Sequence, residues 1–255
     1  MTMSLPEIDH GLKELRLSGM RSTLETRVIQ AQACNQAFLE TFSLVLQDEL
    51  DRRRSRLIER RYQQSGLDEK LTLAEFDWGF NPKIPKQACF ELHALKFIAG
   101  GENALLIGRT GTGKSHVAKA VAYNAVLQGY RVQYLETDVF FTHYALTNPA
   151  LRRTRLRPVI EADLLLLDDL FLSKSIPEDA GELLQSIIHQ RYKLRRSVIV
   201  TSNRVLSDWG AYLGDNTMAT TLLDRLLHRS QALEFEGKSY RLKDAAERLT
   251  RKAKS

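Results

Sequence analysis

The sequence predicts an α/β fold, in which a parallel sheet is flanked by helices and preceded by a small helical domain. Three observations support this prediction. From about residue 87, short apolar runs alternate with helical patterns, which is typical of parallel sheets. The run at 164–167 consists of leucines alone, as expected of a strand buried on both faces. The first 65 residues instead place apolar side chains at helical spacing.

Residues 1–68 are predicted to form the helical N-terminal domain. We expect helix over 5–65 with little interruption, ended by Gly66. Six arginines crowd the second half of this stretch. They are Arg52, Arg53, Arg54, Arg56, Arg60 and Arg61. Because acidic residues lie among them, an ion-paired exposed helix, DNA contact and docking onto a partner protein all stay open for this cluster.

Residues 69–86 are predicted to be a connector, followed by the larger α/β domain over 87–255. Two prolines and a glycine argue for an extended chain here. The connector also carries Phe76, Trp78 and Phe80. We expect these aromatic side chains to lie against a protein surface.

Composition limits the classes of partner. The net charge of +6 and the pI of about 9.3 permit nucleic-acid binding without requiring it. The charges of the first 70 residues balance, so the basic surplus belongs to the remainder. No apolar run approaches the roughly 20 residues that cross a bilayer, so no membrane partner is expected. Cys34 and Cys89 lack metal-ligand spacing and are interpreted as free thiols, which favours a cytoplasmic protein.

The larger domain is predicted element by element. Apolar runs bounded by turns indicate the strands, and longer amphipathic stretches indicate the helices. The predicted strands are Asn103–Ile107, Arg131–Leu135, Leu164–Leu167 and Ser197–Thr201. The predicted helices are Lys114–Leu127 and Glu178–Tyr192.

A glycine-rich loop connects the first of these strands to a helix. It fits the P-loop pattern, in which two glycines bracket four residues and Lys-Ser follows. Its residues are Gly108, Arg109, Thr110, Gly111, Thr112, Gly113, Lys114 and Ser115. Glycines let backbone N–H groups turn toward phosphate oxygens, and the helix N-terminus favours the same anion. Lys114 would reach the β- and γ-phosphates and Ser115 would bind Mg²⁺, so ATP and Mg²⁺ are the predicted cofactors. His116 belongs to the nucleotide-binding segment as a first-turn residue without a catalytic role.

Two carboxylates follow the leucine strand. Asp168 would face the crevice at the carboxyl end of the sheet and hold Mg²⁺. Asp169 would orient and deprotonate the attacking water. The alternative is a strand followed by a solvated acidic turn.

The strand at 197–201 also ends in polar residues. An amide at Asn203 would hold the attacking water between Asp169 and the γ-phosphate. Alternatively, Thr201, Ser202 and Asn203 only cap a helix around 206–213.

The order of these motifs, together with Leu222–His228 and Ser239-Tyr240-Arg241, resembles the AAA+ ATPases. Within them the chain resembles the IstB family, the helper ATPases encoded beside the transposase of certain bacterial insertion sequences. The helicase loader DnaC shares this core. The resemblance covers essentially the whole chain, including the connector motif at 76–82.

The resemblance implies roles by position. Arg225 matches the arginine finger, which reaches the γ-phosphate bound by a neighbouring subunit, so ATP sites at the interfaces of a homo-oligomer are expected. Arg241 matches the second sensor arginine and Asn203 the first sensor. A surface ion pair with Asp224 stays open for Arg225. At Asp169 the wider family more often has glutamate, which bears on the rate of water activation.

A run of arginines lies between the second and third strands. It comprises Arg152, Arg153, Arg155 and Arg157. In initiator-type relatives this insertion meets DNA, and guanidinium groups suit phosphate contacts that do not read sequence. A solvated helix face is the alternative.

The preferred interpretation is an ATPase that oligomerises on double-stranded DNA and assists a transposase in target selection. A DnaC-like loader of a replicative helicase is the nearest alternative. A small-molecule kinase and a switch protein that binds ATP but hardly hydrolyses it are rivals from other classes.

Overall fold

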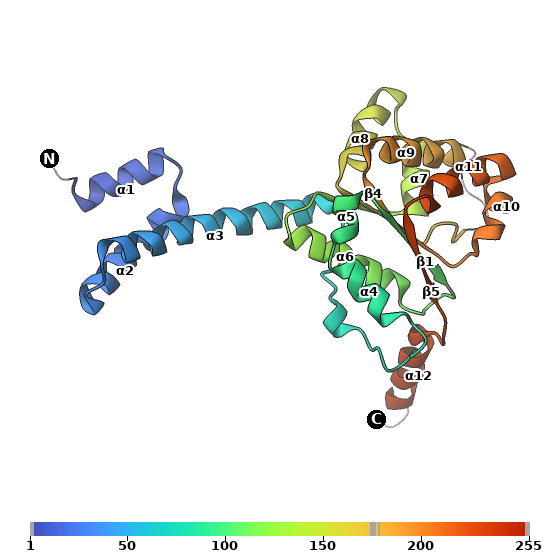
Figure 1. Ribbon diagram of the computed structural model, residues 1–255, viewed down its shortest axis with the longest axis horizontal. Coiled ribbons are helices and arrows are strands. Elements are labelled where there is room, and N and C mark those ends of the chain that lie inside the picture. Colours follow the sequence, from blue (N-terminus) through green and yellow to red (C-terminus); the bar gives the residue numbers. More distant parts are fainter. Residues whose placement is uncertain (1–2, 174–176, 178, 253–255) are drawn as a thin grey trace. The chain divides into compact units, whose positions relative to one another are not determined.

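A computed structural model describes residues 3–173, 177 and 179–252 of the chain (Figure 1). The chain divides into two compact units, Met1–Arg60 and Arg61–Ser255. No helix in the described ranges is both long and apolar enough to span a membrane. Cys34 and Cys89 are free thiols.

The N-terminal unit is built from three helices, α1 (Leu5–Glu14), α2 (Ser18–Cys34) and α3 (Phe38–Ser65). The sequence predicted helix with little interruption, but the structure breaks it twice. Arg16 and Asn35 adopt left-handed backbone conformations, with φ of 57° and 49°, at the two breaks. A left-handed residue cannot continue a right-handed helix, so the chain reverses at these positions.

A buried carboxylate joins α2 to α3. Glu49, only 3% exposed, accepts hydrogen bonds from the backbone N–H groups of Gly19 (2.5 Å) and Met20 (3.3 Å) at the start of α2. Arg53 binds its other oxygen at 2.6 Å. Burial raises the pKa of Glu49, but these hydrogen bonds outweigh it and leave the pKa below its ordinary value. An ionised carboxylate therefore caps α2 from the neighbouring helix.

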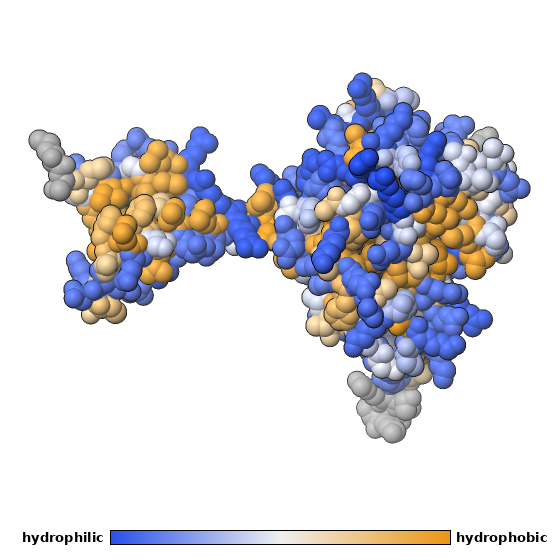
Figure 2. Space-filling view, in the orientation of Figure 1, coloured by the Kyte–Doolittle hydropathy of each residue, from blue (hydrophilic) through white to orange (hydrophobic). Residues whose placement is uncertain are grey.

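The surface of this unit retains much apolar area, which Figure 2 shows in orange among the helices of the unit. Phe38 and Leu39 at the start of α3 are 78% and 75% exposed. The apolar side chains that predicted these helices are therefore only partly used for packing within the unit.

The larger unit is a five-stranded sheet with the strand order β2-β3-β4-β1-β5, in which every pairing is parallel. The strands are β1 (Asn103–Gly108), β2 (Val132–Glu136), β3 (Leu164–Asp168), β4 (Ser197–Ser202) and β5 (Ser230–Phe235). The helices after the sheet begins are α6 (Lys114–Leu127), α7 (Thr137–Ala145), α8 (Pro149–Glu161), α9 (Ala180–Leu194), α10 (Trp209–Leu213), α11 (Asn216–Leu227) and α12 (Tyr240–Lys252). The predicted α/β fold is confirmed. Of the predicted helix 178–192, Glu178 lies outside the described residues.

The central strands β1, β3 and β4 are buried on both faces. Alternate residues such as Leu105, Leu165 and Val198 pack into one core with α9 and α11. The intervening residues, such as Leu106 and Leu166, are fully buried on the face that α6 covers. Parallel strands with both faces covered are continuous apolar runs in sequence, and this is why the leucine run was informative.

The connector contains a short 3₁₀ turn, η1 (Leu73–Glu75), and leads into α4 (Lys86–His93) and α5 (Lys96–Gly100) of the larger unit. A second such turn, η2, spans Leu206–Asp208. Leu73 and Ile84 are buried, the Phe76 ring lies 5.3 Å from that of His116 on α6, and the Phe80 ring lies 5.3 Å from that of Tyr240 on α12. The expectation that the connector aromatics lie against a surface is therefore confirmed.

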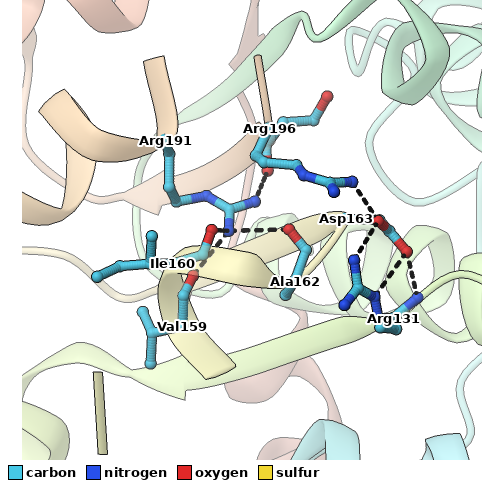
Figure 3. A network of polar contacts seen from close by, with 8 residues as sticks. Arg131, Val159, Ile160, Ala162, Asp163, Arg191 and Arg196 are labelled. Atoms are coloured by element: carbon cyan, nitrogen blue, oxygen red, sulfur yellow. Dashed lines mark hydrogen bonds and ion pairs between the residues drawn. The ribbon is translucent and has the colours of Figure 1, made fainter. Parts of the chain in front are cut away.

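A fully buried arginine ties α8 to the sheet (Figure 3). Arg191 on α9 donates to the carbonyl oxygens of Val159 (2.7 Å), Ile160 (3.1 Å) and Ala162 (3.0 Å), and to that of Ser197 (2.7 Å). Beside it, Asp163 binds Arg131 and Arg196. The guanidinium group thus satisfies the carbonyls that the end of α8 leaves unpaired.

Candidate nucleotide-binding site

The loop between β1 and α6 depends on its glycines. Gly111 and Gly113 have φ of 79° and 100°, a region that side chains disfavour. A Cβ atom at Gly113 would also collide with the Phe76 ring, and one at Gly111 would collide with Ser239. The backbone N–H of Tyr240 donates to the Gly111 carbonyl at 2.8 Å. The loop is thereby packed between the connector and the start of α12.

Lys114 begins α6 and is only 4% exposed. Its ammonium group donates to the Arg109 carbonyl at 2.8 Å. Burial lowers the pKa of Lys114, while the charges of Asp169 and Asp168 oppose that shift. An ammonium group has three donors, so a buried lysine with a single hydrogen-bond acceptor in this structure retains donors for an anion.

The two carboxylates after β3 differ in their surroundings. Asp168 is 4% exposed and accepts from the Thr201 hydroxyl at 2.6 Å and from the Tyr134 hydroxyl at 3.4 Å. Asp169 adopts a left-handed conformation with φ of 52°, and its N–H donates to Thr201 Oγ1 at 2.9 Å. Burial and the charge of Asp168 raise the pKa of Asp169, which Lys114 opposes. The alternative of a solvated acidic turn is therefore wrong.

Asn203 follows β4 with one amide atom unused. Its Nδ2 donates to Thr110 Oγ1 at 3.5 Å, and its buried Oδ1 has no hydrogen-bond partner among the residues that the structure describes. The hydroxyls of Thr201 and Ser202 bind Asp168 and the Leu170 carbonyl, and no side chain caps the helical turn at Leu206–Asp208. The capping alternative is wrong, and the end of β4 faces β3 instead.

A cavity of about 280 Å³ brings Lys114 and Asp169 together, whereas Asp168 and Asn203 are not among its lining residues. The loop residues from Thr110 to His116 line one side, together with Asp169 and Arg241. The connector lines the other with Phe76, Phe80 and Ile84. Arg241 reaches the site from α12, and its charge acts on both Lys114 and Asp169. Gly108, Arg109 and Asn203 line an adjoining pocket.

The connector wall and its attachment were missed in the sequence. Asn81 is buried and forms two hydrogen bonds of 2.9 Å with the backbone of Lys238, one through each amide atom. Lys83 pairs with Glu236 at 3.0 Å. The closely spaced aromatics of the connector were the available signal for a pocket wall, but its partner segment lies 157 residues further along the chain.

Arg225 lies elsewhere. It lines a separate pocket of about 240 Å³ that also contains Asn103, the first residue of β1, whereas the loop follows the last residue of that strand. The pocket is strongly basic. Its cationic side chains are Lys193, Arg195, Arg196, Arg225 and Arg229. Within the described ranges only Arg196 among these pairs with an acid, Asp163. The ion pair of Arg225 with Asp224 is not formed.

The arginines of α8 fall into two groups. Arg152 donates to the carbonyls of Thr147 and Ala145 at the end of α7, and Arg157 pairs with Glu161 at 3.0 Å. Arg153 and Arg155 are exposed and form no ion pair or hydrogen bond among the described residues. The run is therefore partly structural and partly free.

Solved structures share this fold. A crystal structure of DnaI covers 67% of this chain and 90% of its own, with a TM-score of 0.55 and 16% identity. The AMPPCP-bound DnaA from Aquifex aeolicus covers 73% of this chain and 56% of its own, with a TM-score of 0.55 and 24% identity. At such identities the likeness establishes the AAA+ fold alone.

Sequence relatives are closer. A protein described as the ATP-binding protein of insertion sequence IS21 in Pseudomonas aeruginosa is 34% identical, over 93% of this chain and 89% of its own. An insertion-sequence ATP-binding protein from Mycobacterium tuberculosis is 31% identical over 98% of this chain and 100% of its own. The sequence pattern of IstB-like ATP-binding proteins matches residues 10–248. This chain therefore belongs to the IstB-like ATP-binding protein family.

Proposed function

We propose that this chain is an ATPase that assembles on double-stranded DNA and assists the transposase of an insertion sequence. The observation that carries the proposal is the shared cavity, which Lys114, Asp169 and Arg241 line together with the rest of the glycine-rich loop. Relatives named for insertion sequences support the association with transposition.

The residues of the site suit a nucleotide with its magnesium ion. The loop offers backbone N–H groups and a lysine with spare donors to phosphate oxygens. Ser115 and Asp168 are the proposed magnesium ligands, with oxygen donors of the kind this ion prefers. When bound, the ion neutralises charge on the β- and γ-phosphates. The cavity wall formed by Phe76, Phe80 and Ile84 suits the nucleotide base.

Two residues are proposed to handle the attacking water. Asp169 takes a proton from the water as its oxygen attacks the γ-phosphorus, and the bond from that phosphorus to the bridging oxygen breaks to leave ADP. Asn203 Oδ1, a buried acceptor without a partner, orients the water by accepting its other proton. Arg241 balances the charge of the phosphates from α12.

A second subunit is needed to complete the site. Arg225 lies at the opposite end of β1 from the loop, so we propose that it serves the nucleotide of a neighbouring copy. Head-to-tail contacts that bring one face against the other generate rings or filaments. The unpaired cations around Arg225 repel one another, and a neighbour's triphosphate would relieve that repulsion.

Duplex DNA is the proposed surface for assembly. Arg153 and Arg155 are free for phosphate contacts, which give affinity without reading sequence. The exposed pair of Arg157 with Glu161 is weak enough to open. Arg152, held by α7, would contribute least. Replacing Arg153 and Arg155 with alanine should reduce the slope of log affinity against log salt by about 1 per lost contact, whereas Arg152→Ala should leave it nearly unchanged. An unaltered slope in the double variant would contradict the DNA contact.

The proposal that Arg225 acts on the nucleotide of a neighbouring subunit has a direct test. Lys114→Ala cannot hold nucleotide but keeps Arg225, and Arg225→Ala holds nucleotide but lacks the finger. Each alone should release little phosphate in the presence of duplex DNA. Mixed, they should regain part of the wild-type rate, because sites of the second variant then face an intact Arg225. No recovery on mixing would exclude Arg225 as a residue acting between subunits.

The partner is tested by strand transfer. The proposed partner transposase should insert donor ends into a target plasmid more efficiently with the wild type than with Lys114→Ala. If it does not, while a replicative helicase is loaded onto single-stranded DNA instead, the loader alternative takes its place.

A further inference from the structure

Thr201 lies between the two carboxylates of the candidate site. It is the fifth residue of β4 and fully buried. Its hydroxyl donates to Asp168 Oδ1 at 2.6 Å and accepts from the Asp169 N–H at 2.9 Å. Its carbonyl accepts from the Leu170 N–H at 2.9 Å. One residue of β4 thus contacts three successive residues at the end of β3.

These contacts decide how each carboxylate is presented. Oδ1 of Asp168 is occupied by a short, charge-assisted hydrogen bond, whereas the hydrogen bond to Oδ2 within the described ranges is the longer one from Tyr134 at 3.4 Å. Asp169 keeps a left-handed backbone, which costs free energy unless its surroundings hold it. The hydrogen bond from its N–H to Thr201 provides that restraint.

We infer that Thr201 is the positioning residue of the hydrolytic site: it occupies Oδ1 of Asp168, leaving Oδ2 for the metal ion, and fixes the backbone that directs Asp169 to the attacking water. This inference rests on the proposed ATP hydrolysis. In sequence Thr201 is one of the polar residues that end the strand, and its side-chain contacts are what assign it this role.

The side chain at 201 must both donate and accept. A hydroxyl does both, valine of nearly the same shape does neither, and serine keeps both functions without the methyl group. If the Thr201 hydroxyl only stabilised the fold, removing it should have the same effect as removing any other buried hydroxyl near Asp168. Thr137 provides that comparison, because it is also fully buried and donates at 2.6 Å to Asp168, but to the backbone carbonyl rather than the carboxylate.

The experiment compares the full-length wild type with Thr201→Val, Thr201→Ser and Thr137→Val. Affinity for a fluorescent ATP analogue is measured with and without Mg²⁺, and hydrolysis is followed in single turnover on duplex DNA. For Thr201→Val we expect unchanged metal-free affinity and a gain in affinity on adding Mg²⁺ that is about tenfold smaller. Hydrolysis should be about tenfold to hundredfold slower, the size expected when a hydrogen bond to a charged group is lost.

The other variants separate positioning from stability. Thr201→Ser should stay within about threefold of the wild type in both measurements, because it keeps both hydrogen bonds. Thr137→Val should lower the melting temperature yet retain the Mg²⁺-dependent gain. Should Thr201→Val fail to fold, Thr201→Cys, with a weak donor of similar size, replaces it.

Two results overturn the inference. One is a Thr201→Val protein whose Mg²⁺-dependent gain and hydrolysis equal those of Thr137→Val, and the other is a Thr201→Ser protein as defective as Thr201→Val. A wild type that hydrolyses no ATP on DNA would instead refute the proposed ATPase activity, and the Mg²⁺-dependent affinities would still decide the placement of Oδ2.

Discussion

Two buried cations of the larger unit have opposite surroundings. Arg191 is fully buried and donates to four backbone carbonyls (Figure 3). Lys114 is 4% exposed, donates to one carbonyl and forms part of a cavity wall. A cation bound by four main-chain carbonyls holds the fold together, even though its Nε has no partner among the described residues, whereas one with unused donors beside a cavity is available to a ligand.

The free-energy cost of burying the charge is therefore compensated differently for Arg191 and Lys114. Burying a charge is costly unless hydrogen bonds and opposite charge compensate it. For Arg191 the compensation comes from fixed carbonyls at the C-terminal end of α8, where the helix dipole is negative. Burial and repulsion by Arg196 lower the pKa of Arg191, but a guanidinium group remains protonated at neutral pH. The buried charge of Lys114 is compensated mainly by Asp168 and Asp169. Part of the free-energy cost of burying it therefore persists until a phosphate group binds.

The largest expected effect comes from replacing Arg191, the cation bound by four backbone carbonyls. Arg191→Met fills similar volume but leaves four buried carbonyls without a donor, and each unpaired group costs about 1–3 kcal/mol. We expect the free energy of unfolding to fall by about 4 kcal/mol, measured by urea denaturation. Arg153→Met, on the exposed face of α8, is the control and should change it by less than about 0.5 kcal/mol. Equal stability of the two variants would show that the Arg191 network is dispensable.

The second prediction concerns Lys114, the buried cation with unused hydrogen-bond donors. Lys114→Ala should weaken ATP binding at least about hundredfold, which corresponds to about 2.7 kcal/mol, because the phosphates lose a charge-assisted donor. Its unfolding free energy should fall far less than that of Arg191→Met. Isothermal titration with ATP and urea denaturation measure the two quantities. Unchanged affinity would remove Lys114 from the nucleotide site.

The third prediction separates chemistry from folding at the same cavity. Asp169→Asn should slow single-turnover hydrolysis by about a hundredfold, the lower end for loss of a general base, with ATP affinity retained. The raised pKa of Asp169 means that its charged form disfavours the folded state above the unfolded-state pKa. The variant should therefore be at least as stable as the wild type at pH 7. Hydrolysis at the wild-type rate would exclude Asp169 as the base.

The smallest expected effect lies in the N-terminal unit. There the buried carboxylate of Glu49 accepts hydrogen bonds from two backbone N–H groups and from Arg53. Because its pKa is lowered on folding, its contribution is present above the unfolded-state value of about 4.3 and is lost as pH falls through the folded-state value. Glu49→Gln should cost about 1 kcal/mol at pH 7, as for a lost helix cap, with faster hydrogen exchange at Gly19 and Met20. Glu25→Gln, an exposed change on α2, should leave that exchange as it is. Exchange that does not respond to Glu49→Gln would exclude it as the cap.

The sequence predicted the three central strands and the edge strand β2, but missed the edge strand β5. β1, β3 and β4 are continuous apolar runs, whereas β5 lies at the sheet edge and alternates buried Leu233 and Phe235 with exposed residues. The breaks at Arg16 and Asn35 were also missed, because neither residue type demands a left-handed conformation. Local patterns report burial on both faces better than they report edges and chain reversals.

At the site, short local motifs in the sequence predicted the loop and the acidic pair. The roles of Thr201, Asn81 and Arg191 depend on partners between 6 and 157 residues away. A hydroxyl, an amide or a guanidinium group in sequence does not indicate which distant carbonyl or carboxylate it will meet. Those roles follow only from the folded chain.

The double hydrogen bond between Asn81 and Lys238 has a mechanical consequence. The amide mimics a backbone pairing, so the connector and the segment before α12 are joined like adjacent strands. The connector is therefore fixed directly to the segment that leads into the helix carrying Arg241, without passing through the sheet. This part of the cavity wall is held together by two segments that lie 157 residues apart along the chain.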